Sequence, residues 1–517
     1  MRMFLRVLAV LVAATVLPPL TAAAPAGAVT LPALPVPGDP RGAGLSQFTG
    51  HAVAPRPVAV PPVPQHPFMA ANGSSNLHGD AYQSDTYEGP GPTGRDLTVR
   101  SRLQGGLCGS VTFDSRGRIV TVCMTPGLSP RLMLLDPHDL GAVSSLTLPG
   151  TAGTSPTEVS GGGYFYLDQL DRAVVPTKDG TLQVVAVRRD ALVTEARYDL
   201  KPVVGTSGIV SVLPDWSGRM WFVTGSGVVG ALDPATGAVS THVLRGEAIA
   251  NSIAVDESGG VFVVSDHALY RFDAPDGGRP VVTWRVPYDR GSRQKPGQLS
   301  QGSGTTPTLI GPASGPGGGY VAITDNADPR MKVLVMERGK AGPAKVCEQP
   351  VFAPGRGADE NSLVAVGGDL IVENNYGYVV GEHALLKGML GGRQVDTESG
   401  LARVHVDYTT RTCSLAWSDS SERVPSVVSK VSLATGLLYT FTHPTADELR
   451  SARRTGAAAM PDAWYLTALD LRTGKRVWSR LVGSGPLFNN HYAPVTLGSD
   501  GSAYVGVVGG LVRITDS

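Results

Sequence analysis

From Leu97 onward, short runs of β-branched and aromatic residues alternate with Gly- and Asp-containing turns. One phrase recurs about every 40 to 50 residues, which is the spacing of a repeat architecture. It consists of an apolar strand, an Asp-x-x-Gly turn, a β-branched strand, a second turn and a strand that ends in Leu-Asp. Alternation with a period of two predicts strands, and glycine at positive φ lets the chain reverse between them. Four copies are clear, at residues 113–120, 212–221, 254–262 and 497–505.

These repeats predict an all-β fold, because a single twisted sheet of this kind cannot bury both of its faces. Neighbouring sheets must stack into a closed ring, which is a β-propeller of about eight four-stranded blades, with seven as the alternative. We place the blades near 105–150, 153–200, 203–245, 248–288, 302–352, 357–418, 422–482 and 487–517. The last repeat ends after Ile514 and lacks an outer strand. The strand at 96–100 is therefore expected to supply its missing outer strand and to close the ring.

The N-terminus has the pattern of a cleavable export signal. Arg2 and Arg6 precede an apolar run from Val7 to Leu20, and Ala26 and Ala28 form a small-x-small cleavage site. Residues 1–28 are thus predicted to be a signal peptide of a secreted protein; the alternative, a membrane anchor, is disfavoured because Pro18 and Pro19 interrupt the run. We expect a Pro- and Ala-rich linker at 29–67, a polar strap at 68–94 and the propeller at 95–517. The strap is expected to cover either a blade edge or the mouth of the central tunnel.

The net charge of the chain limits the kinds of partner that it is expected to attract. The chain has 44 basic and 44 acidic residues, so nothing draws it toward nucleic acid or anionic lipid. We expect a monomer with no membrane span once the signal is removed, whose partner is an unknown extracellular small molecule or protein.

Four cysteines remain in the mature chain, and an even number in an exported protein favours disulfides. Cys108 and Cys123 flank one hairpin, and Cys347 and Cys413 occupy similar places in consecutive repeats. The expected pairs are Cys108–Cys123 and Cys347–Cys413.

The phrase at residues 468–478, Ala-Leu-Asp-Leu-Arg-Thr-Gly-Lys-Arg-Val-Trp, resembles the tryptophan-docking motif of the quinoprotein alcohol dehydrogenase-like propellers with PQQ-like repeats. The matching positions are Ala468, Asp470, Thr473, Gly474, Lys475 and Trp478, with a partial copy at 233–237. The resemblance implies a turn fixed by Asp470 and a Trp docked between blades. It does not extend to the catalytic marks of the family, such as an adjacent Cys pair, so pyrroloquinoline quinone is not expected.

Polar residues cluster where strands begin or end near the predicted tunnel, and there they could form one site. A calcium ion held by carboxylate and amide oxygens would suit such a ring, with a histidine as base. Turns also favour Asp and Asn because these side chains bond to their own backbone, so a purely structural role is the alternative for each residue. The candidate metal ligands are Asp325, Asn326, Glu373 and Asn374; the ligand-binding candidates are Asn361, Asn375, Asn489 and Asn490; the candidate bases are His78 and His491; and further positions are Asn76, Asp80, Glu158, Asp168, Asn251, Asp266, His267, Thr306 and Ser426.

The sequence therefore predicts a secreted propeller that binds a ligand or protein. The alternative is an enzyme, either a calcium-dependent lactonase-type hydrolase or a PQQ-like oxidoreductase, with its site at the tunnel mouth.

Overall fold

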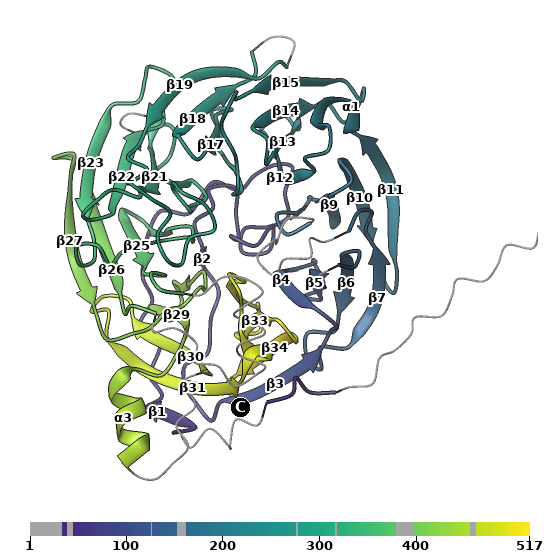
Figure 1. Ribbon diagram of the computed structural model, residues 1–517. Helices are drawn as coiled ribbons and strands as arrows, with labels where there is room; N and C mark the ends of the chain where they lie inside the picture. Colours follow the sequence, from purple (N-terminus) through teal and green to yellow (C-terminus); the bar gives the residue numbers. More distant parts are fainter. Residues whose placement is uncertain are drawn as a thin grey trace, which may run out of the picture.

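The computed structural model describes residues 34–38, 45–125, 127–151, 162–275, 278–315, 318–378, 397–454 and 462–517. The predicted signal peptide and Glu158 lie outside these residues. Eight sheets of four strands form a ring, which confirms the eight-bladed propeller over the seven-bladed alternative (Figure 1). No helix in the described ranges is both long and apolar enough to cross a bilayer.

Within each blade the strands run outward from the central channel in chain order, all antiparallel. The first four blades contain β4 (Leu107–Phe113), β5 (Ile119–Met124), β6 (Arg131–Leu135) and β7 (Ala142–Thr147); β8 (Tyr166–Leu167), β9 (Arg172–Pro176), β10 (Thr181–Val187) and β11 (Leu192–Asp199); β12 (Ile209–Pro214), β13 (Met220–Thr224), β14 (Val228–Leu232) and β15 (Val239–Val243); and β16 (Ala254–Val255), β17 (Val261–Val264), β18 (Ala268–Asp273) and β19 (Val281–Pro287). Their middle strands are buried almost throughout, because each blade packs both faces against its neighbours.

The remaining four blades follow the same plan. They contain β20 (Thr308–Ile310), β21 (Tyr320–Thr324), β22 (Lys332–Glu337) and β23 (Lys345–Pro350); β24 (Val364–Val366), β25 (Asp369–Glu373), β26 (Leu401–Asp407) and β27 (Thr412–Asp419); β28 (Lys430–Ser432), β29 (Leu437–Thr442), β30 (Ala463–Asp470) and β31 (Arg476–Ser484); and β32 (Val495–Leu497), β33 (Ala503–Val507) and β34 (Gly510–Thr515), with β3 (Thr98–Leu103) as the outermost strand. The helical elements are α1 (Lys201–Val204), η3 (Pro486–Phe488) and α3 (Ala446–Arg454), which projects outside the ring (Figure 1).

The ring closes as the sequence predicts. β3 pairs with β34 from Thr98 opposite Thr515 to Leu103 opposite Gly510, so the first propeller strand completes the last blade. The Asp516 carboxylate also accepts hydrogen bonds from the backbone N–H groups of residues 93 to 95, at 2.8 to 3.1 Å. The two ends of the domain are therefore held together, and the last blade receives its fourth, outermost strand.

The docking motif builds the turn between β30 and β31. Asp470 Oδ1 accepts hydrogen bonds from the backbone N–H and the hydroxyl of Thr473, at 2.8 and 2.9 Å. Gly474 follows with φ of 70°, a conformation that glycine adopts without strain. Trp478 is fully buried and packs against Tyr439, with ring centroids 6.2 Å apart. The turn matches what the family resemblance implies, whereas the ring contact of Trp478 is with Tyr439 of the same blade.

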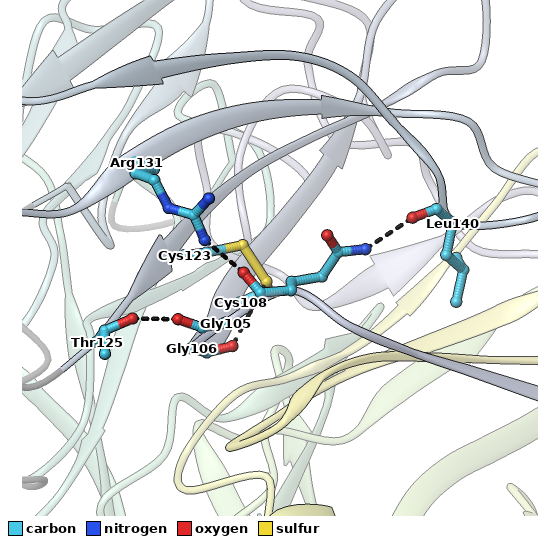
Figure 2. The surroundings of a disulfide bond; sticks show 8 residues. Gly105, Gly106, Cys108, Cys123, Thr125, Arg131 and Leu140 are labelled. Atoms are coloured by element: carbon cyan, nitrogen blue, oxygen red, sulfur yellow. Dashed lines mark hydrogen bonds between the residues drawn. A yellow bond between two sulfur atoms is a disulfide. The ribbon is translucent and has the colours of Figure 1, made fainter. Parts of the chain in front are cut away.

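Both predicted disulfides are present. Cys108–Cys123 joins β4 to β5 inside the first blade (Figure 2), and Cys347–Cys413 joins β23 to β27, the outermost strands of two neighbouring blades. Around the first bridge, the Thr125 hydroxyl donates to the Gly105 carbonyl and the Arg131 guanidinium donates to the Gln104 carbonyl (Figure 2). Such bridges persist in oxidising compartments, as an exported protein requires.

Before it joins the ring, the chain passes along the outside of the seventh blade and then across the central channel. β1 (Phe48–Gly50) pairs with β31 as an additional outer strand. β2 (Thr86–Tyr87), within the strap of residues 68–94, runs parallel to β28, the innermost strand of the same blade. The seventh sheet thus has six strands, two of which come from the segment before the propeller.

The strap crosses the channel and contacts the innermost strands of blades on opposite sides of it. Strap carbonyls accept backbone hydrogen bonds from Leu167, Val255, Leu309, Ala365 and Val431, at 2.7 to 3.2 Å. All strap residues from 75 to 85 are buried although most of them are polar. Hydrogen bonds within the strap offset the cost of burying these polar groups. The Asp80 carboxylate, for example, accepts hydrogen bonds from the Ser84 N–H at 3.2 Å and from the Ser84 hydroxyl.

Candidate functional site

A cavity lies on the propeller axis between the strap and the N-terminal ends of the innermost strands. The centre of a water-sized molecule can occupy about 80 Å³ of it, within about 700 Å³ of space free of protein atoms that includes open solvent. Leu77 and His78 of the strap contribute one side of it. The walls come from the residues that precede or begin the innermost strands of seven blades, among them Ser110, Tyr164, Asn251, Thr306, Glu360, Asn361, Val428 and His491.

A buried polar cluster holds the strap side of the cavity in place. Asp85 lies at its centre: His78 Nδ1 is 3.0 Å from Asp85 Oδ1, and both the Lys430 ammonium and the Ser362 hydroxyl donate to the same carboxylate. Lys430 Nζ also donates to the Leu77 carbonyl at 2.7 Å. Because Lys430 comes from β28 and Ser362 from the residues just before β24, the cluster ties the strap to two blades.

Burial decides which members of this cluster are charged. Desolvation lowers the pKa of His78, which favours the neutral imidazole, and it also lowers the pKa of Lys430. Burial alone would raise the pKa of Asp85, but the charges of His78 and Lys430 and the hydrogen bonds from both hold it below its usual value. These directions favour an ion pair between Asp85 and Lys430 with a neutral His78 beside it.

The second ring nitrogen of His78, a residue of the cavity lining, is Nε2. Since Nδ1 faces the Asp85 carboxylate, Nδ1 carries the proton and Nε2 is left as an acceptor. Nε2 is buried and has no hydrogen-bond partner in the protein. A histidine oriented in this way by a carboxylate can accept a hydrogen bond or a proton from a bound molecule.

Two further acceptors on the cavity wall lack a donor. Asn361 Oδ1 and Glu360 Oε1 are buried atoms without a hydrogen-bond partner in the protein. The Asn361 amide is fixed from behind, because its Nδ2 donates to the Val427 carbonyl at 2.7 Å and to Glu373 Oε2 at 3.2 Å. An unsatisfied buried acceptor costs roughly 1–3 kcal/mol, so a ligand that brings donors would be stabilised here.

Of the predicted site residues, the structure brings His78, Asn251, Thr306, Asn361 and His491 to this one cavity. His491 Nδ1 is 3.2 Å from the Tyr378 hydroxyl. Asn76 and Asp80 lie within the strap and bond to it: Asn76 Nδ2 donates to the Asp80 carbonyl at 3.1 Å.

The other predicted asparagines and carboxylates support the wall from behind through backbone and side-chain hydrogen bonds. Asn375 Oδ1 accepts from the Glu360 N–H at 2.9 Å, Asn489 Oδ1 from the His491 N–H at 2.8 Å, and Asn490 Oδ1 from the Ser426 hydroxyl at 3.1 Å. Asn374 Oδ1 accepts from the Ala358 and Tyr376 N–H groups, and Asp325 Oδ1 from those of Ala327 and Lys332. Asn326 Nδ2 donates to the Arg290 and Arg293 carbonyls, Glu373 Oε1 accepts from the Ser429 N–H, and Asp266 Oδ1 contacts His267 Nδ1 at 2.8 Å.

Asp168, one of the further predicted positions, lies in a turn. It follows β8, the two-residue innermost strand of the second blade. Its Oδ1 accepts from the Leu170 and Arg172 N–H groups, at 2.9 Å each, in the turn that leads to β9.

The proposed metal ligands are Asp325, Asn326, Glu373 and Asn374. Within the part of the chain that the structure describes, no group of three or more His, Cys, Asp or Glu side chains is arranged to hold a metal ion. The contacts given above for these four residues are hydrogen bonds to the protein.

The Glu373 carboxyl, fully buried behind Asn361, gives the protein a pH dependence that can be isolated. Desolvation raises its pKa to about 7. A carboxyl whose pKa is raised on folding contributes stability at low pH that is lost as the pH rises from its unfolded value through 7. Glu373→Gln removes this titrating group. Between pH 4.5 and pH 8, the free energy of unfolding of the variant should therefore rise by about 3 kcal/mol relative to that of the wild type.

Urea denaturation of both proteins at pH 5 and pH 8 measures this gain. Glu348→Gln, at an exposed ion pair on β23, is the control and should show a constant difference over the same range. A Glu373→Gln difference that is flat with pH would mean that the carboxyl is already ionised at pH 5.

The most prominent site residues that the sequence did not single out are Glu360, Tyr164, Asp85 and Lys430. Lys430 could have been identified from the sequence, because a lysine in a strand that lines the centre of a propeller needs a buried anion as its partner. Glu360 directly precedes Asn361, a predicted strand-entry residue, and the same reasoning could have included it.

Comparison with known proteins agrees with the fold. No protein-family model matches the chain. An uncharacterised protein of Archaeoglobus fulgidus is 25% identical over 429 residues, which is 78% of each chain. Similar solved structures include the quinohemoprotein alcohol dehydrogenase of Comamonas testosteroni, with 11% identity, a TM-score of 0.53 and coverage of 86% of this chain and 81% of that one. The C-terminal WD40 domain of Sif2 has 10% identity and a TM-score of 0.50, with coverage of 81% and 98%. These likenesses show a shared propeller fold.

Proposed function

We propose that the protein is an exported binding propeller that takes a small molecule carrying hydrogen-bond donors into its axial cavity. The observation that carries this proposal is a set of three buried acceptors without a partner in the protein, His78 Nε2, Glu360 Oε1 and Asn361 Oδ1, which all belong to residues that line the cavity. Buried acceptors in native proteins are normally satisfied, and a concave site with a few convergent polar groups is the usual form of a ligand site. The disulfides and the export signal predicted at residues 1–28 support a role outside the cell.

Saturation-transfer NMR with cyclohexane-1,4-diol, a small neutral donor of hydrogen bonds, tests this function. We expect transfer to the diol in the wild-type protein and its loss in Ala250→Phe, because Ala250 is an exposed residue of the cavity wall where a phenyl ring would block entry. Ala341→Phe, in the exposed turn between β22 and β23, is the matched control and should retain the signal. Equal signals in the two variants would contradict binding in the axial cavity.

One observation favours a second candidate, a hydrolase. The Asp85–His78 pair leaves Nε2 free to accept a proton from an attacking water in the cavity. Hydrolysis of a γ-lactone by the wild type that stops in Ala250→Phe would support this candidate over simple binding.

A further inference from the structure

The charge on the cavity wall is one-sided. Among the lining residues that the structure describes, Glu360 is the only acidic one and none is Lys or Arg. The ammonium of Lys430 is not part of the lining, and it is already engaged by Asp85 and by the Leu77 carbonyl. A ligand in the cavity therefore meets one carboxyl that has no cation of its own.

The unpaired hydrogen-bonding atoms of the lining residues are also all of one kind. His78 Nε2, Asn361 Oδ1 and Glu360 Oε1 are all acceptors, and each lacks a donor. A ligand that offered mainly acceptors, such as a carboxylate or a phosphate, would leave these atoms unsatisfied and, wherever Glu360 is ionised, would bring a second negative charge beside it.

Aromatic rings complete the surroundings. Tyr164 and Tyr492 both line the cavity, and both lie close enough to Glu360 for its charge to raise their pKa values, although desolvation is the larger cause. The Tyr492 hydroxyl is anchored by donation to the Gly297 carbonyl at 2.9 Å, and the Tyr164 ring stacks on that of His78 with centroids 6.4 Å apart. Tyrosine rings stabilise cations that approach their faces.

Resting on the proposed function, we infer that the ligand is a small organic cation with N–H donors, a primary or secondary ammonium whose charge is matched by Glu360. Its N–H groups supply the donors that the three acceptors lack. Binding would thus satisfy the hydrogen bonds and the buried charge together.

The inference predicts a pH dependence with a defined sign. Desolvation raises the pKa of Glu360 to about 8 in the free protein. An ammonium requires the carboxylate, so binding below pH 8 must release a proton, and the affinity should be about tenfold lower at pH 7 than at pH 9. The titratable groups facing Glu360 are Asp359, Tyr164 and Tyr492, while His78 and His491 line the same cavity.

Two matched probes separate charge from shape: trans-4-aminocyclohexanol, which is a cation from pH 6 to pH 9, and neutral cyclohexane-1,4-diol. Their affinities are measured by NMR titration at pH 7 and pH 9. At pH 9 we expect the amine to bind at least tenfold more tightly than the diol. The amine should weaken about tenfold at pH 7, whereas the diol should not follow this trend.

Glu360→Gln should remove the pH dependence and lower the ratio of amine to diol affinity to about one. Glu348→Gln, on the outer strand β23, is the matched control and should leave the ratio unchanged. If Glu360→Gln does not fold, the pH profile of the wild type decides alone.

The outcomes distinguish this inference from the proposed function. Equal affinities for the two probes, or an amine affinity independent of pH, would overturn the cation inference while leaving a binding cavity. Failure of both probes to bind would overturn both proposals.

Discussion

Lys430→Met should lower the free energy of unfolding by about 3–5 kcal/mol, because it removes one partner of a buried ion pair. Lys430 and Asp85 are both fully buried, and the Lys430 ammonium donates to the Asp85 carboxylate and to the Leu77 carbonyl. The methionine fills most of the space, but it leaves a carboxylate whose only other polar neighbours are the neutral His78 and the Ser362 hydroxyl. The strap would then lose its main attachment to β28.

Urea denaturation of two comparison variants tests this reason. Lys332→Met removes a half-exposed pair with Glu348, 3.2 Å apart, and should cost less than about 1 kcal/mol. Adding Asp85→Asn to Lys430→Met should recover part of the loss, since the stranded charge disappears. Equal losses for Lys430→Met and Lys332→Met would show that the buried pair does not hold the strap.

Replacing the disulfide between blades, as Cys347→Ser with Cys413→Ser, should cost about 4 kcal/mol. The bridge closes a loop with a sequence separation of 66 residues and links β23 to β27. The chain entropy that a cross-link removes from the unfolded state grows with the logarithm of the loop, which gives about 4 kcal/mol for this loop. Unfolding under non-reducing conditions measures the loss.

The other disulfide provides the internal comparison. Cys108 and Cys123 are separated by 15 residues, for which the same relation gives about 3 kcal/mol. Cys108→Ser with Cys123→Ser should therefore cost less than the variant of the longer bridge. The reverse order would mean that local packing in the first blade, and not the entropy of the unfolded chain, dominates.

Features that are local in sequence could be predicted. The turn at Asp470 and Gly474 is formed by residues that are close together in the sequence. The blade repeats could be predicted from the alternation of apolar and polar positions. The closing strand β3 could be deduced because the last repeat lacks a strand and the residues before the first blade have a strand pattern. The Cys108–Cys123 disulfide followed from the hairpin that the two cysteines flank, and the Cys347–Cys413 disulfide followed from equivalent positions in consecutive repeats.

The site could be predicted only in part. The entry positions of the innermost strands converge because the ring closes, and this brought Asn251, Thr306, Asn361 and His491 to one cavity. The route of the strap could not be predicted, because it depends on contacts between residues hundreds of positions apart, such as Asp85 with Lys430. The hydrogen bond from the Glu360 N–H to Asn375 Oδ1 became visible only once the blades were placed.

The central claim is that the space between the strap and the strand entries is a ligand site. A crystal structure of the protein soaked with trans-4-aminocyclohexanol at pH 9 tests it most directly. The account predicts the amine in the axial cavity, with its donors on His78 Nε2, Asn361 Oδ1 and Glu360. A cavity that contains only water, or an amine bound elsewhere on the ring, would contradict it.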